Sequence, residues 1–169
     1  MKILKLGVFL AIVAALSGGA LSYVNGITAP IIEQNELETE RNTLKSMYPD
    51  ASDDDFVSVD ISKIDSKTIQ KVYKYNDYYI FNMSVSGYKD GTTFLVSIDK
   101  NTNTIDKYVA LSNGDTKGLG SKVTEDAFKE SMEGNDASGQ LDTISGATIT
   151  SSNVVNGINE AASVMAQLD

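Results

Sequence analysis

The chain begins with an apolar segment that is long enough to cross a membrane. No charged residue occurs from position 6 to position 32, and the part from 6 to 24 is strongly apolar. A helix over that part rises about 28 Å, which is close to the thickness of the hydrocarbon core of a bilayer. Whatever follows must therefore fold as a domain on a membrane anchor, or as an exported domain once the segment has been removed.

Charges on the two sides of this segment predict its orientation. Lys2 and Lys5 precede it, and glutamates follow it at positions 33, 36, 38 and 40. The positive-inside rule places the basic end in the cytoplasm. We predict a single-pass protein of the cell membrane with a cytoplasmic N-terminus and an extracytoplasmic domain. A cleaved signal peptide is the alternative, because Ala20-Leu21-Ser22 resembles a cleavage site, although the apolar run is long for one.

The residue inventory excludes several kinds of chemistry. The 169 residues include neither cysteine nor histidine. This excludes disulfides, thiolate and imidazole metal sites, Fe–S clusters and Ser-His catalysis, and we predict no metal and no catalytic side chain. Redox chemistry would need an organic cofactor. The formal net charge of −9 makes nucleic acid a poor partner.

Hydrophobic periodicity divides the remaining chain into helical and strand segments. Residues 31–48 carry a thin helical stripe, with Pro30 at the predicted helix start. Further helices are predicted over 124–132 and from about 151 to 168. Segments rich in β-branched and aromatic residues lie between turn signals at 56–59, 68–75, 78–85, 92–98 and 104–111. Tyrosines of this region are assigned to cross-strand packing, with stacking on a planar ligand as the alternative.

Short connections between these segments favour an antiparallel meander. Strands followed by helices predict an α+β fold, in which an N-terminal transmembrane helix precedes one domain with an antiparallel sheet and flanking helices. We divide the chain into a transmembrane anchor (1–29), a linking helix with an acidic loop (30–55) and the domain (56–169).

A turn of small and hydroxyl residues precedes the predicted C-terminal helix, with the sequence Asp142-Thr143-Ile144-Ser145-Gly146-Ala147-Thr148-Ile149-Thr150. Gly146 permits a positive φ and the close approach of a ligand. Hydroxyl residues at 150–152 are candidate N-caps of the helix. A phosphate on Thr148 would face the free N–H groups at the start of that helix. A capping turn without any ligand explains the same residues, so the pattern leaves both interpretations open.

A second candidate stretch is the glycine-rich loop at 114–122, which contains three glycines. Such a loop can fold its backbone against a flat ligand, with Leu119 as an apolar contact. No βαβ unit surrounds it, so it is not a dinucleotide fingerprint. Lys117 and Lys122 are candidates to stabilise a reduced, anionic cofactor, and ordinary solvated lysines are the alternative.

With these motifs the sequence resembles RnfG, the FMN-binding component of the Rnf electron-transport complex, and its flavin-carrying relative in the sodium-pumping NADH:quinone oxidoreductase. The resemblance covers nearly the whole chain. It includes Ile27-Thr28-Ala29-Pro30-Ile31-Ile32, the strand pair around Gly87-Tyr88 and 91–99, the Gly118-Leu119-Gly120 loop, and Asp142-x-x-Ser145-Gly146-Ala147-Thr148-x-Thr150. In that family the last motif is recognised by a flavin transferase of the ApbE type, which joins FMN to its Ser-Gly-Ala-Thr threonine through a phosphoester.

The resemblance implies an FMN-binding domain with a covalent phosphoester to Thr148. It implies further cofactor contacts from the two stretches, namely Asp142, Ser145, Gly146, Ala147 and Thr150 in one and Thr116, Gly118, Leu119, Gly120 and Lys122 in the other. The family loop usually reads Glu-Thr-Pro-Gly-Leu-Gly, often with a histidine shortly before it. Here the loop reads Asp115-Thr116-Lys117-Gly118-Leu119-Gly120, so the proline and the histidine are lost and Asp115 stands in the place of the glutamate.

The function implied by the resemblance is electron transfer within a membrane ion-translocating oxidoreductase complex. The chain would be an electron-carrier subunit rather than an enzyme by itself. Its partners would be other Rnf-type membrane subunits and, during maturation, the ApbE-type flavin transferase. Two alternatives are a stand-alone membrane-anchored flavoprotein for extracellular electron transfer and a non-redox surface binding module.

Overall fold

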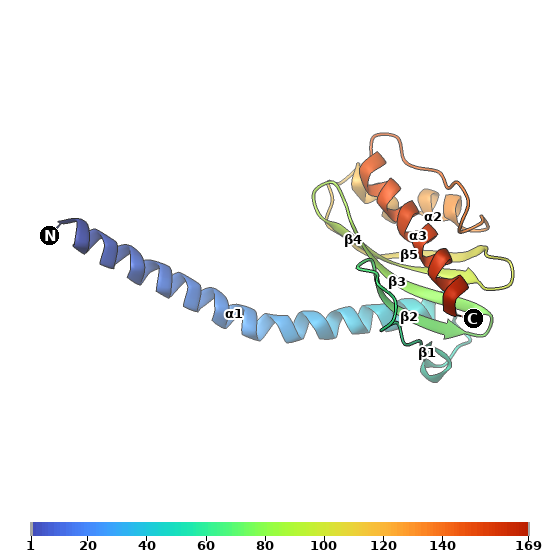
Figure 1. The fold of residues 1–169 in the computed structure, drawn as a ribbon, viewed down its shortest axis with the longest axis horizontal. Coiled ribbons are helices and arrows are strands. Elements are labelled where there is room, and N and C mark those ends of the chain that lie inside the picture. Colours follow the sequence, from blue (N-terminus) through green and yellow to red (C-terminus); the bar gives the residue numbers. More distant parts are fainter. Residues whose placement is uncertain (1, 169) are drawn as a thin grey trace. The chain divides into compact units, whose positions relative to one another are not determined.

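The computed structural model describes residues 2–168, which divide into two compact units between Asn42 and Thr43. The first unit is part of a long helix, and the second holds the sheet and the other helices (Figure 1). The α+β fold class is confirmed. The predicted division into an anchor, a linking segment and a domain remains a prediction.

Helix α1 (Lys2–Met47) runs without a break through Pro30, so the prediction that Pro30 begins a second helix is wrong. Proline removes one backbone N–H donor from a helix interior. Residues with good helix propensity follow Pro30 and continue the helix past this single lost bond. Within the described residues, α1 is the one helix that is long and apolar enough to span a membrane.

The second unit is built on a five-stranded sheet in which every neighbouring pair is antiparallel. The strands are β1 (Val57–Ser58), β2 (Ile69–Tyr75), β3 (Tyr78–Ser86), β4 (Gly91–Asp99) and β5 (Ile105–Asn113). Their spatial order follows the chain order, which confirms the predicted meander. The short connections explain it, because they allow only neighbouring antiparallel pairs.

The main core lies between one face of the sheet and the two helices α2 (Asp126–Met132) and α3 (Thr148–Leu168) (Figure 1). Phe81 and Phe94 from the sheet are fully buried there, as is Ile158 from α3. Gly157 lets α3 lie close to the sheet, because a Cβ at this position would be 3.1 Å from Val85 Cγ1.

The opposite face of the sheet carries a smaller core, to which Leu44 and Met47 at the end of α1 contribute. Tyr48 follows them, and its ring centroid lies 4.7 Å from that of Tyr75. Its hydroxyl donates a hydrogen bond of 2.6 Å to Asp106. Burial, followed by this bond, raises the pKa of Tyr48 well above its ordinary value. These contacts hold the segment after α1 on the sheet.

Two helix starts differ from the sequence-based expectation. A 3-10 helix over Gly120–Thr124 precedes α2, and α2 is capped by Glu125, so Thr124 does not open it. Helix α3 begins at Thr148, three residues before the predicted start, and positions 150–152 lie inside it rather than capping it. Short 3-10 turns commonly lead into α-helices, and a sequence pattern does not locate such an end to the residue.

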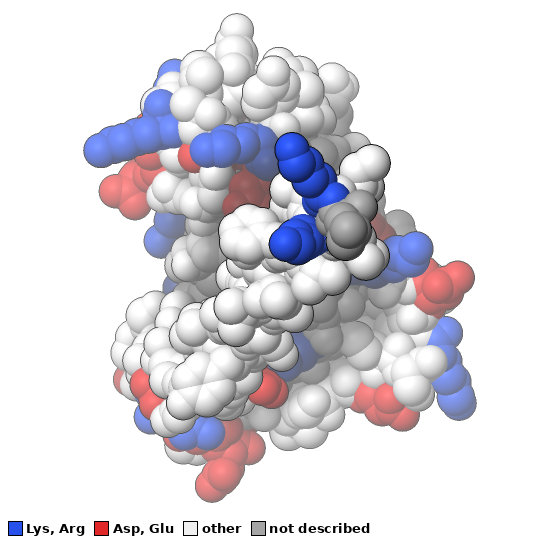
Figure 2. Space-filling model, turned by 90° about the vertical axis from the view of Figure 1, so that its left-hand side faces the viewer, with Lys and Arg blue, Asp and Glu red and all other residues white. Residues whose placement is uncertain are grey.

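Acidic and basic side chains are intermixed over the face of the molecule shown in Figure 2. The net charge of −9 is therefore not concentrated on this face as one acidic patch.

Candidate functional site

A cavity of about 410 Å³ lies where the first turn of α3 approaches the loop after β5. Its size is within the usual range for small-molecule sites, roughly 300–1,000 Å³. It is lined by Tyr88, Asp115, Thr116, Leu119, Gly120, Gly146, Ala147, Thr148, Ile149 and Thr150.

Exposed apolar side chains gather at this cavity. Outside α1, the large apolar residues left exposed in the described chain are Val57, Tyr88, Leu119 and Ile149, and the last three line the cavity. Tyr88 is 77% exposed, Ile149 53% and Leu119 50%. Exposed apolar side chains clustered beside polar groups typically mark a ligand or partner site.

Gly146 and Ala147 place Thr148 at the first position of α3. Gly146 has a φ of 82°, a left-handed conformation that glycine adopts without strain. The Ala147 carbonyl accepts the first helical hydrogen bond, 3.0 Å from the Ser151 nitrogen. Thr148 is exposed, and no hydrogen bond of its hydroxyl group is found within residues 2–168. The first N–H groups of a helix lack helical partners and attract anions.

Ser151 fixes the turn before α3 from inside the helix. The Ile144 N–H donates to the Ser151 hydroxyl at 2.9 Å, and that hydroxyl donates to the Ala147 carbonyl at 3.0 Å. Ser151 is fully buried. A serine that bonds backward in this way starts the helix earlier than a capping pattern predicts, which explains the difference in helix start.

Asp115 accepts hydrogen bonds from two other segments of the cavity wall. The backbone N–H groups of Tyr88, Lys89 and Asp90 lie 3.2, 2.6 and 3.2 Å from its carboxylate oxygens. The Thr150 hydroxyl donates to the same carboxylate from the first turn of α3. The glycine loop, the β3–β4 turn and α3 are thus joined at one side chain.

The carboxylate of Asp115 is ionised at neutral pH. Partial burial alone would raise its pKa, but the hydrogen bonds from Thr150 and from the three backbone N–H groups outweigh that effect and lower it. Asp115 is the one charged side chain among the described residues that line the cavity. The local charge is therefore negative.

Glycines make room for this carboxylate. A Cβ on Gly87 would collide with the Asp115 side chain and with the Asp90 carbonyl, and a Cβ on Gly120 would also collide with the Asp115 side chain. Glycine is needed at both positions because backbone and carboxylate approach closely, not because of an unusual φ.

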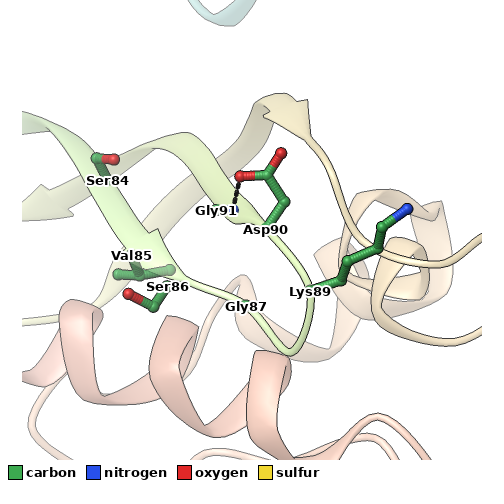
Figure 3. Close-up of a pocket in the computed structure, with 7 residues that line it drawn as sticks. All are labelled: Ser84, Val85, Ser86, Gly87, Lys89, Asp90 and Gly91. Atoms are coloured by element: carbon green, nitrogen blue, oxygen red, sulfur yellow. Dashed lines mark hydrogen bonds between the residues drawn. The ribbon is translucent and has the colours of Figure 1, made fainter. Parts of the chain in front are cut away.

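The β3–β4 turn that carries Tyr88 has a hollow of its own, of about 340 Å³ (Figure 3). The Asp90 carboxylate accepts a hydrogen bond of 2.7 Å from the Gly91 N–H, and the Lys89 side chain extends away from the strands. The Gly87 N–H donates to the Asp90 carbonyl at 2.8 Å. These bonds make the turn compact, with Tyr88 at its tip.

The structure brings together most, but not all, of the expected contact residues. Those that line the cavity are Thr116, Leu119, Gly120, Gly146, Ala147, Thr148 and Thr150. Asp142 and Lys122 line a separate hollow of about 180 Å³ beside α2. Ser145, Gly118 and Lys117 are exposed and are not among the residues that line either hollow.

Three residues that line the cavity are not among the expected contacts: Tyr88, Asp115 and Ile149. Asp115 begins the glycine-loop motif, and Ile149 occupies a variable position inside the threonine motif. Cross-strand packing is the sequence-based expectation for Tyr88, yet its side chain is highly exposed. Its position after Gly87, at the tip of a turn, is the signal that could have found it.

Comparison with known proteins assigns the two parts of the chain. The family described as "FMN-binding domain" matches residues 87–163, and the family described as "RnfG N-terminal region" matches residues 1–47. The first match contains every residue that lines the cavity. The chain belongs to the RnfG family.

Relatives in this family match over almost their full length. The RnfG protein of the proton-translocating ferredoxin:NAD(+) oxidoreductase complex of Clostridium ljungdahlii is 28% identical, over 90% of this chain and 85% of that protein. Its counterpart in the Na(+)-translocating ferredoxin:NAD(+) oxidoreductase complex of Acetobacterium woodii is 27% identical, over 98% and 93%. The counterpart in the ion-translocating oxidoreductase complex of Methanosarcina acetivorans is 24% identical, over 95% and 93%.

These matches agree with the fold of each unit. The N-terminal match ends at Met47, which is also the last residue of α1. The apolar length of α1 and the relatives from ion-translocating complexes support a membrane anchor. The FMN-binding domain match identifies FMN as the cofactor class of the second unit.

Proposed function

We propose that this protein is an electron-carrying subunit of an Rnf-type ion-translocating oxidoreductase complex and that it holds FMN covalently, through a phosphoester to Thr148. The observation that carries the proposal is the exposed Thr148 hydroxyl at the start of α3, beside an apolar cavity inside the FMN-binding segment. When bound, FMN supplies one- and two-electron redox chemistry that no side chain of this chain offers.

The start of α3 suits a phosphate. Its free N–H groups and the positive end of the helix dipole favour an anion on Thr148. Gly146 and Ala147 add no large side chain beside that position. Among the described residues no lysine or arginine lines the cavity, so within it the helix start is the feature that favours the phosphate.

The opposite part of the cavity suits a flat aromatic ring. Tyr88, Leu119 and Ile149 offer exposed apolar surface there. An aromatic side chain and branched apolar side chains can contact the faces of a planar ring and exclude water from them. The role of this chain is therefore to retain the cofactor, orient its ring and limit where electrons can go.

The proposal includes a location and partners. The domain lies on the extracytoplasmic side, because Lys2 and Lys5 hold the N-terminus in the cytoplasm. An ApbE-type flavin transferase attaches the FMN, and other membrane subunits of the complex exchange electrons with it. Asp142, which lies in a hollow apart from the cavity, contributes to recognition by the transferase rather than to the flavin contact.

Flavin attachment is tested by expressing the full chain together with the transferase and separating the products on a denaturing gel. We expect a fluorescent band at the mass of the chain, and we expect Thr148→Ala to abolish it. Thr143→Ala is the matched control, because it removes another exposed hydroxyl from the same segment, and it should keep the band. A fluorescent band in Thr148→Ala, or none in the unaltered chain, would contradict covalent attachment at this residue.

A further inference from the structure

The carboxylate of Asp115 joins segments that lie far apart in the sequence. It accepts hydrogen bonds from the N–H groups of residues 88–90 at 2.6 to 3.2 Å and from the Thr150 hydroxyl. Thr150 also accepts a bond of 3.3 Å from the Tyr88 N–H. Hydrogen bonds to an ionised acceptor are stronger than those between neutral groups. One side chain therefore sets the separation between the β3–β4 turn and the first turn of α3.

The surrounding backbone is shaped to admit this side chain. Gly87 and Gly120 lie on the two segments that face the carboxylate, and a Cβ on either would collide with it. A chance surface bond would not need glycine on both of these segments. The closeness of the contacts indicates that the position of the Asp115 carboxylate is closely constrained.

Tyr88 has little else to hold it in place. Its side chain is 77% exposed although it lines the cavity. Its N–H bonds to Asp115 and Thr150 connect it to the remainder of the cavity wall. Thr150 lies in the same helical turn as Thr148. The distance from Tyr88 to the attachment residue therefore depends on Asp115.

We propose that Asp115 is the positioning residue of this cavity, and that it holds the Tyr88 turn against the start of α3 so that Tyr88 contacts the ring of the flavin on Thr148. The inference rests on the proposed function for the flavin, but the tie between the two segments does not. Loss of Asp115 leaves the flavin attached through Thr148 and leaves its ring without the Tyr88 contact.

The tie is tested without flavin, by hydrogen exchange on the full chain in detergent. In Asp115→Ala, the amides of residues 88–90 should exchange about tenfold faster or more, because each loses a bond to a charged acceptor. In Asp115→Asn the increase should be smaller, because the amide oxygen can still accept from Lys89 and Asp90. Asp65→Asn, an exposed carboxylate in the β1–β2 loop, is the charge-matched control and should change nothing. Equal exchange in all variants would overturn the proposal.

The ring contact is tested on the flavin-loaded chain. Asp115→Ala should keep its fluorescent band on the denaturing gel, while the native protein shows weaker visible circular dichroism and brighter flavin emission. Tyr88→Leu should give the same spectral change, and the double variant should add nothing further, because both substitutions remove one contact. An unchanged spectrum in Asp115→Ala, or additive changes in the double variant, would overturn the role assigned to Tyr88.

These two experiments separate the inference from the proposed function. If the unaltered chain carries no covalent flavin, the proposed function fails, and hydrogen exchange alone decides whether Asp115 ties the segments together. If Asp115→Ala does not fold, as judged by far-ultraviolet circular dichroism, Thr150→Val removes one partner of the carboxylate and gives the same comparison. Thr150→Val should then speed exchange at Tyr88, and normal exchange there would overturn the tie.

Discussion

Ionisation of Asp115 links the stability of the folded domain to pH. Hydrogen bonds lower the pKa of this carboxyl group in the folded state, whereas the unfolded chain has the ordinary value of about 3.9. A group with a lowered folded pKa contributes stability above its unfolded pKa, and this contribution is lost as the pH falls through the folded pKa. The stabilising effect of Asp115 should therefore be complete at pH 7 and should vanish in strong acid.

This expectation can be measured by urea unfolding of the unaltered chain and Asp115→Asn over a series of pH values. We expect Asp115→Asn to lower the free energy of unfolding by about 1 kcal/mol at neutral pH, the scale of the bonds that it weakens at a partly exposed site. The difference should shrink below about pH 4. Asp65→Asn serves as the reference for loss of an exposed charge. A difference that stays constant down to pH 2, or grows in acid, would contradict the linkage.

The partners of Asp115 show where sequence reasoning stops at this scale. The motif around Thr148 and the Gly118-Leu119-Gly120 loop are local, so they mark their own segments as candidates. The bonds from Asp115 reach residues 25 to 27 positions away, and strand register decides which residues meet. No local pattern encodes that meeting. The exposure of Tyr88 escapes sequence reasoning for the same reason, because it depends on the turn and not on its neighbours in the sequence.

At the scale of the element, the packing of α3 on the sheet depends on Gly157. A Cβ there would lie 3.1 Å from Val85 Cγ1 and 3.4 Å from Met83 Cε, so a larger side chain has no space. Gly157→Leu should lower the free energy of unfolding by about 1–3 kcal/mol, the usual effect of overpacking a core. Ala166→Leu places the same side chain on an exposed position of α3 and should change stability little.

Thermal or urea unfolding of both variants checks this prediction. Equal stability of Gly157→Leu and the unaltered chain would mean that α3 can move away from the sheet without penalty. The flavin band should persist in Gly157→Leu wherever the domain still folds, because the substitution lies more than two helical turns from Thr148.

Element type is more predictable than element ends. The strands are predictable because β-branched and aromatic residues lie between strong turn signals, and Asn76 and Asn103 adopt the positive φ values of 52° and 56° that such turns use. The start of α3 differs from its prediction because Ser151 turns inward and bonds to the preceding turn. Helix α1 continues through Pro30, against the prediction, because one lost hydrogen bond is not enough to end a long helix.

At the scale of the whole molecule, the orientation of α1 decides where the flavin works. Alkaline phosphatase fused to the C-terminus should be active, because that enzyme folds only outside the cytoplasm, and the mass of the purified chain should include the N-terminal lysines. An inactive fusion that is present in normal amount would place the domain in the cytoplasm. A chain that begins near Ser22 would instead support the cleaved signal peptide.

The close seat of α3 on the sheet at Gly157 also fixes the pivot of any group attached at Thr148. Such a group cannot diffuse away, and it explores only the sphere that its own chemical tether allows. For a partner that docks within this radius, the effective concentration of cofactor is set by tether length, on the order of millimolar for short flexible links, and not by the supply of free flavin. Electron exchange then becomes a search by rotation about one residue.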